Sequence, residues 1–265
     1  MKPPPISLAY SPCPNDTFSF FHLSNQKEYQ TQLHDIETLN EHALKQTYDV
    51  SKLSFHAWLF VQEKYQLLQV GAALGRGCGP LLVRKKENTQ PLSPTETVAI
   101  PGEYTTAHLL FKLRFPHHKN RCFMPFDQII DAVANQQVDA GIIIHESRFL
   151  FKKQGLKCEV DLGEWWTQKT NLPIPLGCMV AKKSLGTQTI THIEAQIRHS
   201  IQTALTDPKS VWKYVKKHAQ ELDTSTLEKH IQTFVNPYSL QLGTEGKAAI
   251  KMLQTLLNQN MENAE

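Results

Sequence analysis

The stretch "VDAGIIIHESRF" (residues 138–149) decides the fold expected for this chain. Residues 138–144 are mostly apolar, and a short apolar run is typical of a strand buried on both faces of a parallel sheet. Four polar residues, from His145 to Arg148, follow directly. This abrupt change predicts that the chain leaves a buried core at residue 145, where polar side chains face either solvent or a ligand.

The segments around this stretch alternate between strand-like and helix-like patterns, which predicts an α/β fold with largely parallel sheets. A first series has strands at 6–11 and 48–54 and helices at 15–23, 36–45 and 55–65. A second series follows the polar linker 85–96, with strands at 97–102, 121–126 and 138–144 and helices at 105–113 and 127–137. Because each series opens with a strand that leads into a helix, two similar lobes are expected.

Two extended apolar segments, 77–85 and 174–183, lie where the chain would pass between the lobes, as the hinge strands of a bilobal protein do. The last part of the chain is almost wholly helical in pattern and is expected to pack on the first lobe. We therefore predict one lobe from residues 1–90 plus 182–265, a second lobe from 91–181, and a ligand cleft between them.

Composition argues against several classes of protein. The formal net charge is only +3 and the basic residues are scattered, so no nucleic-acid partner is expected, although a small anionic ligand is compatible with this charge. No segment approaches the roughly 20 apolar residues of a membrane span. The N-terminal "MKPPPISLAY" lacks the apolar core of a signal peptide, which predicts a cytoplasmic protein. Five widely spaced cysteines are expected to be reduced and mostly buried.

Candidate ligand-binding residues follow from the predicted strand ends. Open α/β sheets bind ligands beyond the carboxyl ends of their strands, where helix N-termini present free amides and a positive dipole end. Thr105, Thr106 and Ala107 open the helix after the strand 97–102. They form either an ordinary threonine cap or a site for a carboxylate or phosphate.

The first lobe offers two further strand ends. In "SPCPNDTF" (11–18) two prolines stiffen the loop, and Asn15 or Asp16 is expected to cap the next helix with hydrogen-bonding groups to spare for a ligand. Lys52 and Ser54 end the strand 48–54. Lys52 either pairs with an anionic substrate or is an ordinary surface lysine.

His145 is the strongest candidate for chemistry. Histidine exchanges a proton near neutral pH, so an imidazole at a strand end beside a ligand is a credible general base, the alternative being a structural histidine at the rim of the sheet. Glu146 is expected to orient that ring or to cap the next helix, and Arg148 to pair with a carboxylate or with substrate. "HESRF" does not have the second histidine of a zinc protease motif, and no metal is predicted.

Eight blocks in the same order then resemble one known family. They are "SPCPNDTF", "DIETLN", "KLS", "GAALGRGCGPLLV", "IPGEYTTA", "DAGIIIHESRF", "DLGEWW" and "LPIPLG", spread over residues 6–180. The chain resembles the 1,4-dihydroxy-6-naphthoate synthases of the futalosine route to menaquinone. The resemblance implies a type II periplasmic-binding-protein-like fold.

The same resemblance implies a function. It is that of a cytoplasmic carbon–carbon lyase that converts cyclic dehypoxanthine futalosine into 1,4-dihydroxy-6-naphthoate and dihydroxyacetone without a cofactor. The histidine of the HESR block would be the general base, which is His145 here. The family's substrate contacts would fall on Lys52, Leu53, Ser54, Thr105, Thr106 and Ala107.

Two other functions stay open at this point. A module that binds or senses a small carboxylate on the same fold would need no base, but it would normally carry an export signal or a fused DNA-binding segment, and neither is seen. A related protein that binds the naphthoate without cleaving any bond is the third reading. Sequence sets no oligomeric state in any of the three cases.

Overall fold

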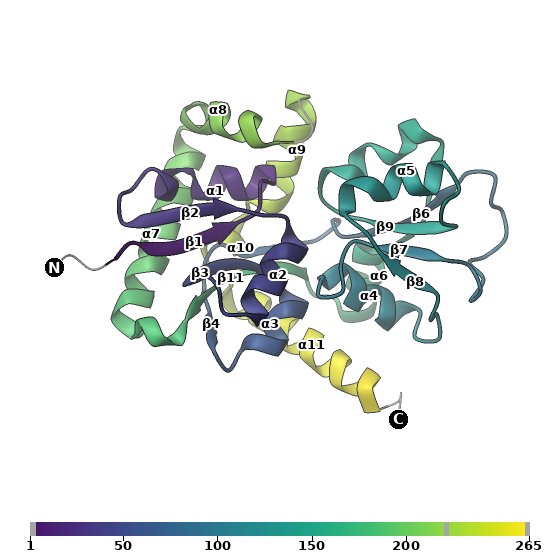
Figure 1. Cartoon of the computed structure of the whole chain (residues 1–265), viewed down its shortest axis with the longest axis horizontal. Coiled ribbons are helices and arrows are strands. Elements are labelled where there is room, and N and C mark those ends of the chain that lie inside the picture. The colour runs from purple at the N-terminus through teal and green to yellow at the C-terminus, as the bar shows by residue number, and fades with distance from the viewer. Residues whose placement is uncertain (1–3, 220–222, 263–265) are drawn as a thin grey trace. The chain divides into compact units, whose positions relative to one another are not determined.

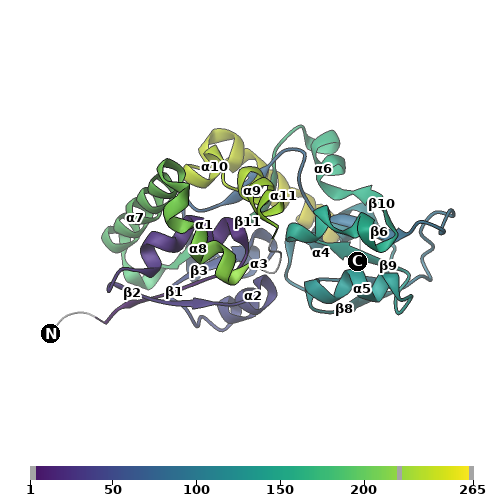
Figure 2. The same ribbon diagram turned by 90° about the horizontal axis from the view of Figure 1, so that it is seen from above.

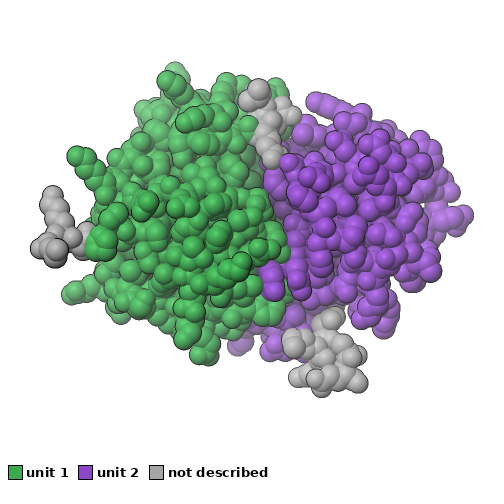
Figure 3. Space-filling model, viewed as in Figure 1, with its two compact units in different colours: residues 1–74, 176–247 green, residues 75–175, 248–265 purple. Residues whose placement is uncertain are grey.

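The computed structural model describes residues 4–219 and 223–262. The chain separates into two compact units, Met1–Leu74 with Leu176–Lys247 (unit 1) and Gly75–Pro175 with Ala248–Glu265 (unit 2), which Figure 3 colours separately. These divisions differ from the lobes expected from sequence: residues 75–90 and 248–265, expected in the first lobe, fall in unit 2, and residues 176–181, expected in the second lobe, fall in unit 1. The apolar segment 77–85, expected to be a hinge strand, contains β6 (Leu81–Lys85), which is hydrogen-bonded between two other strands of unit 2.

Unit 1 is built on a mixed sheet with the strand order β2-β1-β3-β11-β4, and β5 pairs with β11. Its strands are β1 (Ile6–Tyr10), β2 (Tyr29–Leu33), β3 (Val50–Ser54), β4 (Tyr65–Leu67), β5 (Ala73–Gly75) and β11 (Ile174–Lys182). The first three are mutually parallel, as expected, whereas β11 is antiparallel to β3 and β4. All five residues of β3 are buried, because strands lie on both sides of it and helices pack near it.

The helices of unit 1 form two groups (Figures 1 and 2). The first is α1 (Pro14–Ser24), which packs against α7 (Thr187–Thr206), α8 (Pro208–His218) and α9 (Thr224–Phe234). The second is α2 (Ile36–Leu44) with α3 (Phe55–Val61). The short α10 (Pro237–Leu240) contacts α7, and α11 (Gly243–Glu262) begins in unit 1.

The contact of α1 with α7 shows why the C-terminal segment is helical. Ile190, Ile193, Ile197 and Ile201 recur at helical spacing and are all buried in the core of unit 1. At the same contact the Ser200 hydroxyl donates a 2.6 Å hydrogen bond to a backbone carbonyl of α1. The expected helical C-terminal segment is therefore present, and its first helix, α7, packs on α1 in the core of unit 1.

Unit 2 contains a second mixed sheet with the strand order β10-β6-β9-β7-β8. Its other strands are β7 (Val98–Ile100), β8 (Arg121–Phe123), β9 (Ala140–Ile143) and β10 (Leu156–Asp161), and its helices are α4 (Thr106–Arg114), α5 (Ile129–Ala134) and α6 (Leu162–Thr170). Short 3-10 turns lie at Phe126–Gln128, His145–Phe149 and Phe151–Gln154. The apolar run of 138–144 contains the central strand β9, whose four residues are buried.

Candidate functional site

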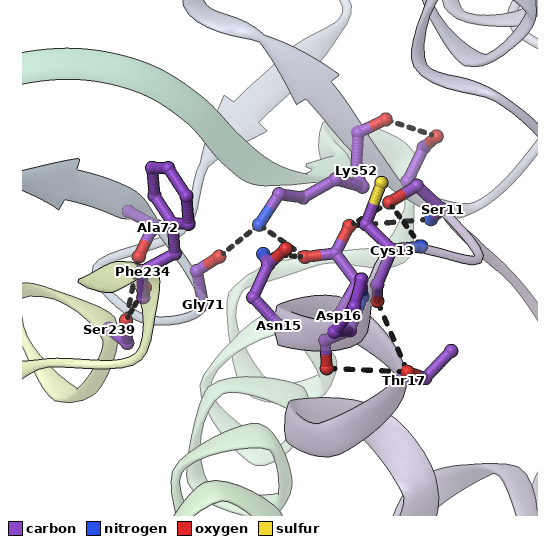
Figure 4. A network of polar contacts seen from close by, with 12 residues as sticks. Ser11, Cys13, Asn15, Asp16, Thr17, Lys52, Gly71, Ala72, Phe234 and Ser239 are labelled. Carbon is purple, nitrogen blue, oxygen red and sulfur yellow. Dashed lines mark hydrogen bonds and ion pairs between the residues drawn. The ribbon is translucent and has the colours of Figure 1, made fainter. Parts of the chain in front are cut away.

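The ends of two parallel strands place the unit 1 candidates at one edge of the sheet. Leu8 of β1 pairs with Val50 of β3, and Ala9 pairs with Ser51. Both strands run in the same direction, so the loop after β1 and residues 52–54 of β3 share the carboxyl edge. Asn15, Asp16 and Lys52, which lie far apart in sequence, are brought into one polar network there (Figure 4).

A buried ion pair forms the centre of this network. The Lys52 ammonium lies 2.9 Å from the Asp16 carboxylate, and the two side chains are only 5% and 3% exposed. Lys52 also donates to the backbone carbonyl of Gly71 at 2.9 Å. Lys52 is therefore not a surface lysine, and its charge already has a partner inside unit 1.

The Gly71 backbone approaches Lys52 closely because this residue has no side chain. Its φ is +74°, and a Cβ atom there would lie 2.6 Å from Cγ of Met179 in β11. Both the left-handed backbone and the lack of space favour glycine. A larger residue would push the Gly71 carbonyl away from the Lys52 ammonium.

Asp16 is held by two further side-chain donors. The Ser11 hydroxyl donates to one carboxylate oxygen at 2.7 Å, and the Asn15 side-chain amide donates to the other at 2.8 Å. The expectation that Asn15 or Asp16 caps α1 is wrong, because the N-cap is Cys13 and it makes no side-chain cap hydrogen bond. Pro14 fixes the first helical position, which puts Asn15 and Asp16 inside the first turn, from where they contact the network instead.

The remaining unit 1 candidates have buried side chains. Leu53 is completely buried and pairs through its backbone with Cys178. The Ser54 amide donates to the Asn40 side-chain oxygen at 2.9 Å, and the Asn40 amide donates back to the Ser54 hydroxyl at 3.1 Å. Asn40 thereby fixes the end of β3, a role that sequence reasoning did not assign to it.

Unit 2 repeats the arrangement at the ends of β7 and β9. These strands are parallel, with Val98 opposite Ala140 and Ala99 opposite Gly141, so the segments that follow them leave the same edge of the sheet. Thr105 caps α4 as expected, accepting a 3.2 Å hydrogen bond from the His108 amide and donating to the Gly102 carbonyl. Thr105, Thr106 and Ala107 are all nearly buried.

His108 supports this helix end from inside. Its Nδ1 lies 2.8 Å from the Glu103 carbonyl and its Nε2 lies 3.1 Å from the Arg121 guanidinium. The carbonyl can only accept and the guanidinium can only donate, so Nδ1 carries the proton and Nε2 accepts. Burial lowers the pKa of His108 to about 4, which keeps the ring neutral. The two hydrogen bonds fix the loop that leads into α4.

His145 begins the 3-10 turn directly after β9. Its φ is +56°, in the left-handed region that non-glycine residues rarely adopt. The residue as a whole is half-buried, its Nε2 atom is buried, and its ring contacts the Phe126 ring edge-on, with centroids 5.0 Å apart. A strained backbone at a histidine on a strand end is an arrangement that is enriched at functional sites.

Of the two charged neighbours of His145, Arg148 pairs with a carboxylate, which is one of the two alternatives expected from sequence. Arg148 donates to the Gly79 carbonyl at 2.7 Å and pairs with Asp161 at 3.2 Å. Asp161 in turn caps α6, so these contacts tie the 3-10 turn to that helix. Glu146 is 4% exposed and neither caps the turn nor has a partner for its Oε2 among the described residues.

Several residues of these networks were missed from sequence. The buried His230 of α9 lies 2.9 Å from the Asn15 side-chain oxygen, and Ser239 of α10 contacts the loop that carries Gly71. His230 and Asn15 are 215 positions apart. The only sequence signals were polar residues on otherwise apolar helix faces, as for Asn40 beside Leu39 and His230 beside Ile231.

Metal-binding clusters and cysteine thiols are the remaining groups that could carry chemistry. Among the residues that the structure describes, no three His, Cys, Asp or Glu side chains are grouped so that they could hold a metal ion. Cys13, Cys78 and Cys178 are buried, Cys122 is half-buried and Cys158 is exposed, and all five are free thiols, as expected. Burial raises the pKa of Cys78 to about 11, which makes it a poor nucleophile.

Comparison with solved structures defines the class of fold. The alkanesulfonate-binding protein SsuA from Xanthomonas axonopodis pv. citri superposes with a TM-score of 0.73 at 14% identity, over 98% of this chain and 94% of that one. SsuA from Escherichia coli gives 0.66 at 11% identity. At this identity the likeness concerns the fold alone, and the predicted periplasmic-binding-protein-like fold is confirmed. Among the described residues, no helix combines the length and hydrophobicity needed to cross a membrane.

Closer relatives define the family. The family described as menaquinone biosynthesis matches residues 6–259. Proteins named "1,4-dihydroxy-6-naphtoate synthase" from Thermus thermophilus and Streptomyces coelicolor are 40% and 39% identical, each over 94% of this chain and 92% of the relative. Protein AF1704 from Archaeoglobus fulgidus, a solved structure, is 33% identical, with a TM-score of 0.91 and 98% coverage of both chains. The chain belongs to the menaquinone biosynthesis family.

Proposed function

We propose that this chain is a carbon–carbon lyase that converts cyclic dehypoxanthine futalosine into 1,4-dihydroxy-6-naphthoate and dihydroxyacetone. The observation that carries the proposal is the 40% identity, over 94% of the chain, to a relative named for synthesis of that naphthoate. Substrate and second product are those implied by the sequence blocks around Lys52, Thr105 and His145.

His145 is the proposed general base. An imidazole has an unperturbed pKa of about 6.5, so it can accept a proton near neutral pH. Cleavage of the carbocycle needs a proton to leave a hydroxyl or an activated carbon, after which the remaining bicycle becomes aromatic. The position of His145 at the end of β9, with a left-handed backbone, supports its role as the base. One well-placed base can serve this reaction.

The start of α4 is the proposed site for the substrate carboxylate. The first amides of a helix point toward an anion and carry the positive end of the helix dipole. Thr105 and His108 hold this end of the helix in place, and neither contributes a negative charge. Thr106 and Ala107 would then bind the carboxylate through their backbone amides.

The strand end of unit 1 is proposed to bind the polar remainder of the substrate. Since the charge of Lys52 is matched by Asp16, this network is close to neutral and suits hydroxyl groups better than a carboxylate. Lys52, Ser54, Asn15 and Asp16 are the proposed contacts. Leu53 would act only through its backbone, because its side chain is completely buried.

Incubation of the purified protein with cyclic dehypoxanthine futalosine, without added metal or cofactor, tests the proposal. The expected result is the appearance of 1,4-dihydroxy-6-naphthoate and dihydroxyacetone by mass spectrometry. Isothermal titration under the same conditions separates the alternatives. Binding of the substrate or the naphthoate without any conversion would contradict the lyase and identify a binding or sensing module.

A further inference from the structure

His230, on the C-terminal helix α9, is hydrogen-bonded to the polar network around Asp16 and Lys52 in unit 1. It lies on α9, is 1% exposed, and its Nε2 is 2.9 Å from the Asn15 side-chain oxygen. It also packs on the Phe234 ring, with centroids 4.7 Å apart. The contact joins α9 to the first turn of α1.

The direction of each hydrogen bond follows from the Asp16 carboxylate. A carboxylate can only accept, so Asn15 must turn its NH₂ group toward Asp16, which leaves its oxygen facing His230. That oxygen can only accept, so His230 must donate. The network therefore requires a proton on Nε2 of His230.

The same C-terminal segment also holds the other partner of Lys52. The Ser239 hydroxyl donates to the Ala72 carbonyl at 2.9 Å, and the Ser239 carbonyl accepts from the Gly71 amide at 2.7 Å. Figure 4 shows Ser239 and Phe234 beside the Gly71–Ala72 loop, with Lys52 reaching toward Gly71. Residues of α9 and α10 thus fix the two groups, Asn15 and Gly71, that lie on either side of the ion pair.

We propose that His230 is a positioning residue of this site. By donating from Nε2 it fixes the Asn15 amide, which in turn orients the Asp16 carboxylate and the Lys52 ammonium at the end of β3. The proposal rests on the proposed function in one respect, namely that the groups at this strand end contact the substrate.

Two substitutions separate this role from simple packing. His230→Phe keeps the aromatic contact with Phe234 but removes the donor, whereas His230→Gln can place an amide NH near the Nε2 position. A displacement of binding groups can lower kcat/KM by about 100-fold, so we expect a loss of about 10- to 100-fold for His230→Phe and substantial rescue by His230→Gln. Equal losses in both variants, or no loss in either, would overturn the proposal.

Ser200→Ala is the matched control, because it also removes a buried hydrogen bond to α1 but at a residue outside the network. It should lower the melting temperature and leave kcat/KM unchanged. A double-mutant cycle adds a second criterion: in an Asn15→Ala background, His230→Phe should cause less than about a twofold further loss. A full additional loss would show that His230 does not act through Asn15.

The tautomer of His230 gives a readout that needs no turnover. Nitrogen chemical shifts of the labelled full-length protein should show a protonated Nε2 in the wild type, and the assignment follows from its loss in His230→Gln. A bare Nε2 would contradict the network. If the wild type fails to convert cyclic dehypoxanthine futalosine, the proposed function fails, while this measurement still decides the hydrogen-bond direction at His230.

Discussion

The strand ends of the two units differ in the charge of their most deeply buried polar groups. In unit 1 a full ion pair, Asp16 with Lys52, is buried and surrounded by hydrogen bonds. In unit 2 the buried supporting group, His108, is kept neutral, and His145 lies on a left-handed backbone. The difference indicates that the network at the strand end of unit 1 is hydrogen-bonded and nearly neutral, whereas unit 2 carries the group proposed to move a proton.

The largest expected effect concerns the buried ion pair. Asp16→Asn leaves the Lys52 ammonium buried without a counter-charge, and breaking such a pair costs about 3–5 kcal/mol in the free energy of unfolding. Urea denaturation measures this loss. The reference is Lys182→Met, which breaks the partly exposed pair with Asp49 and should cost about 1 kcal/mol or less.

The double variant Asp16→Leu with Lys52→Met sharpens this test, because it removes both charges together. It should recover much of the stability lost in Asp16→Asn, since replacing a buried pair by apolar residues is often close to neutral. A cost for Asp16→Asn as small as that for Lys182→Met would show that the unit 1 network does not depend on charge pairing.

The next largest effect is the pH dependence of the free energy of unfolding that His108 causes in unit 2. The pKa of His108 is lowered to about 4 in the folded protein, against 6.5 for the ordinary group, so the unfolded chain binds more protons between these values. Stability is therefore unaffected by this group above pH 6.5 and falls as the pH drops through that window. For His108→Asn, the decrease in unfolding free energy between pH 7 and pH 5 should be smaller than in the wild type by about 2 kcal/mol.

Thr105→Ala serves as the control for this experiment. It removes the cap of the same helix but adds or removes no titratable group, so its cost of about 1 kcal/mol should be the same at both pH values. A His108→Asn variant with the acid sensitivity of the wild type would contradict a neutral buried His108.

The smallest effect concerns the backbone at His145. In the left-handed region alanine is less favourable than glycine by about 1 kcal/mol, so His145→Gly should be more stable than His145→Ala by that amount. At His42, in the right-handed helix α2, the order should be reversed by a similar amount. Thermal or urea unfolding of the four variants makes the comparison, and glycine being worse than alanine at both positions would argue against strain at His145.

Much of this arrangement was predictable from local sequence. The apolar run before His145 predicted a buried strand, and Thr105 after "IPG" predicted a capped helix, because both signals act over a few residues. The edge strand β2, "YQTQL", was missed because three of its five residues are polar, so the segment lacks the apolar run that marks a buried strand. The apolar segment 77–85 was mistaken for a hinge because burial inside a sheet produces the same pattern.

The contacts within the networks could not be predicted in this way. The pairing of Lys52 with Asp16 depends on the parallel register of β1 and β3, which places two distant loops at one edge. The contact of His230 with Asn15 depends on how α9 packs on α1 after the chain has passed through unit 2. Such contacts arise from tertiary packing, on which local propensity and periodicity carry no information.

The central claim, that the His145 imidazole is the base of the reaction, is tested most directly by His145→Asn. Turnover of cyclic dehypoxanthine futalosine and its dissociation constant should be measured on the same preparation. The account predicts a fall in kcat of about 100-fold or more, with a dissociation constant within about threefold of the wild type. A variant that binds the substrate and turns it over at a near-normal rate would contradict the claim.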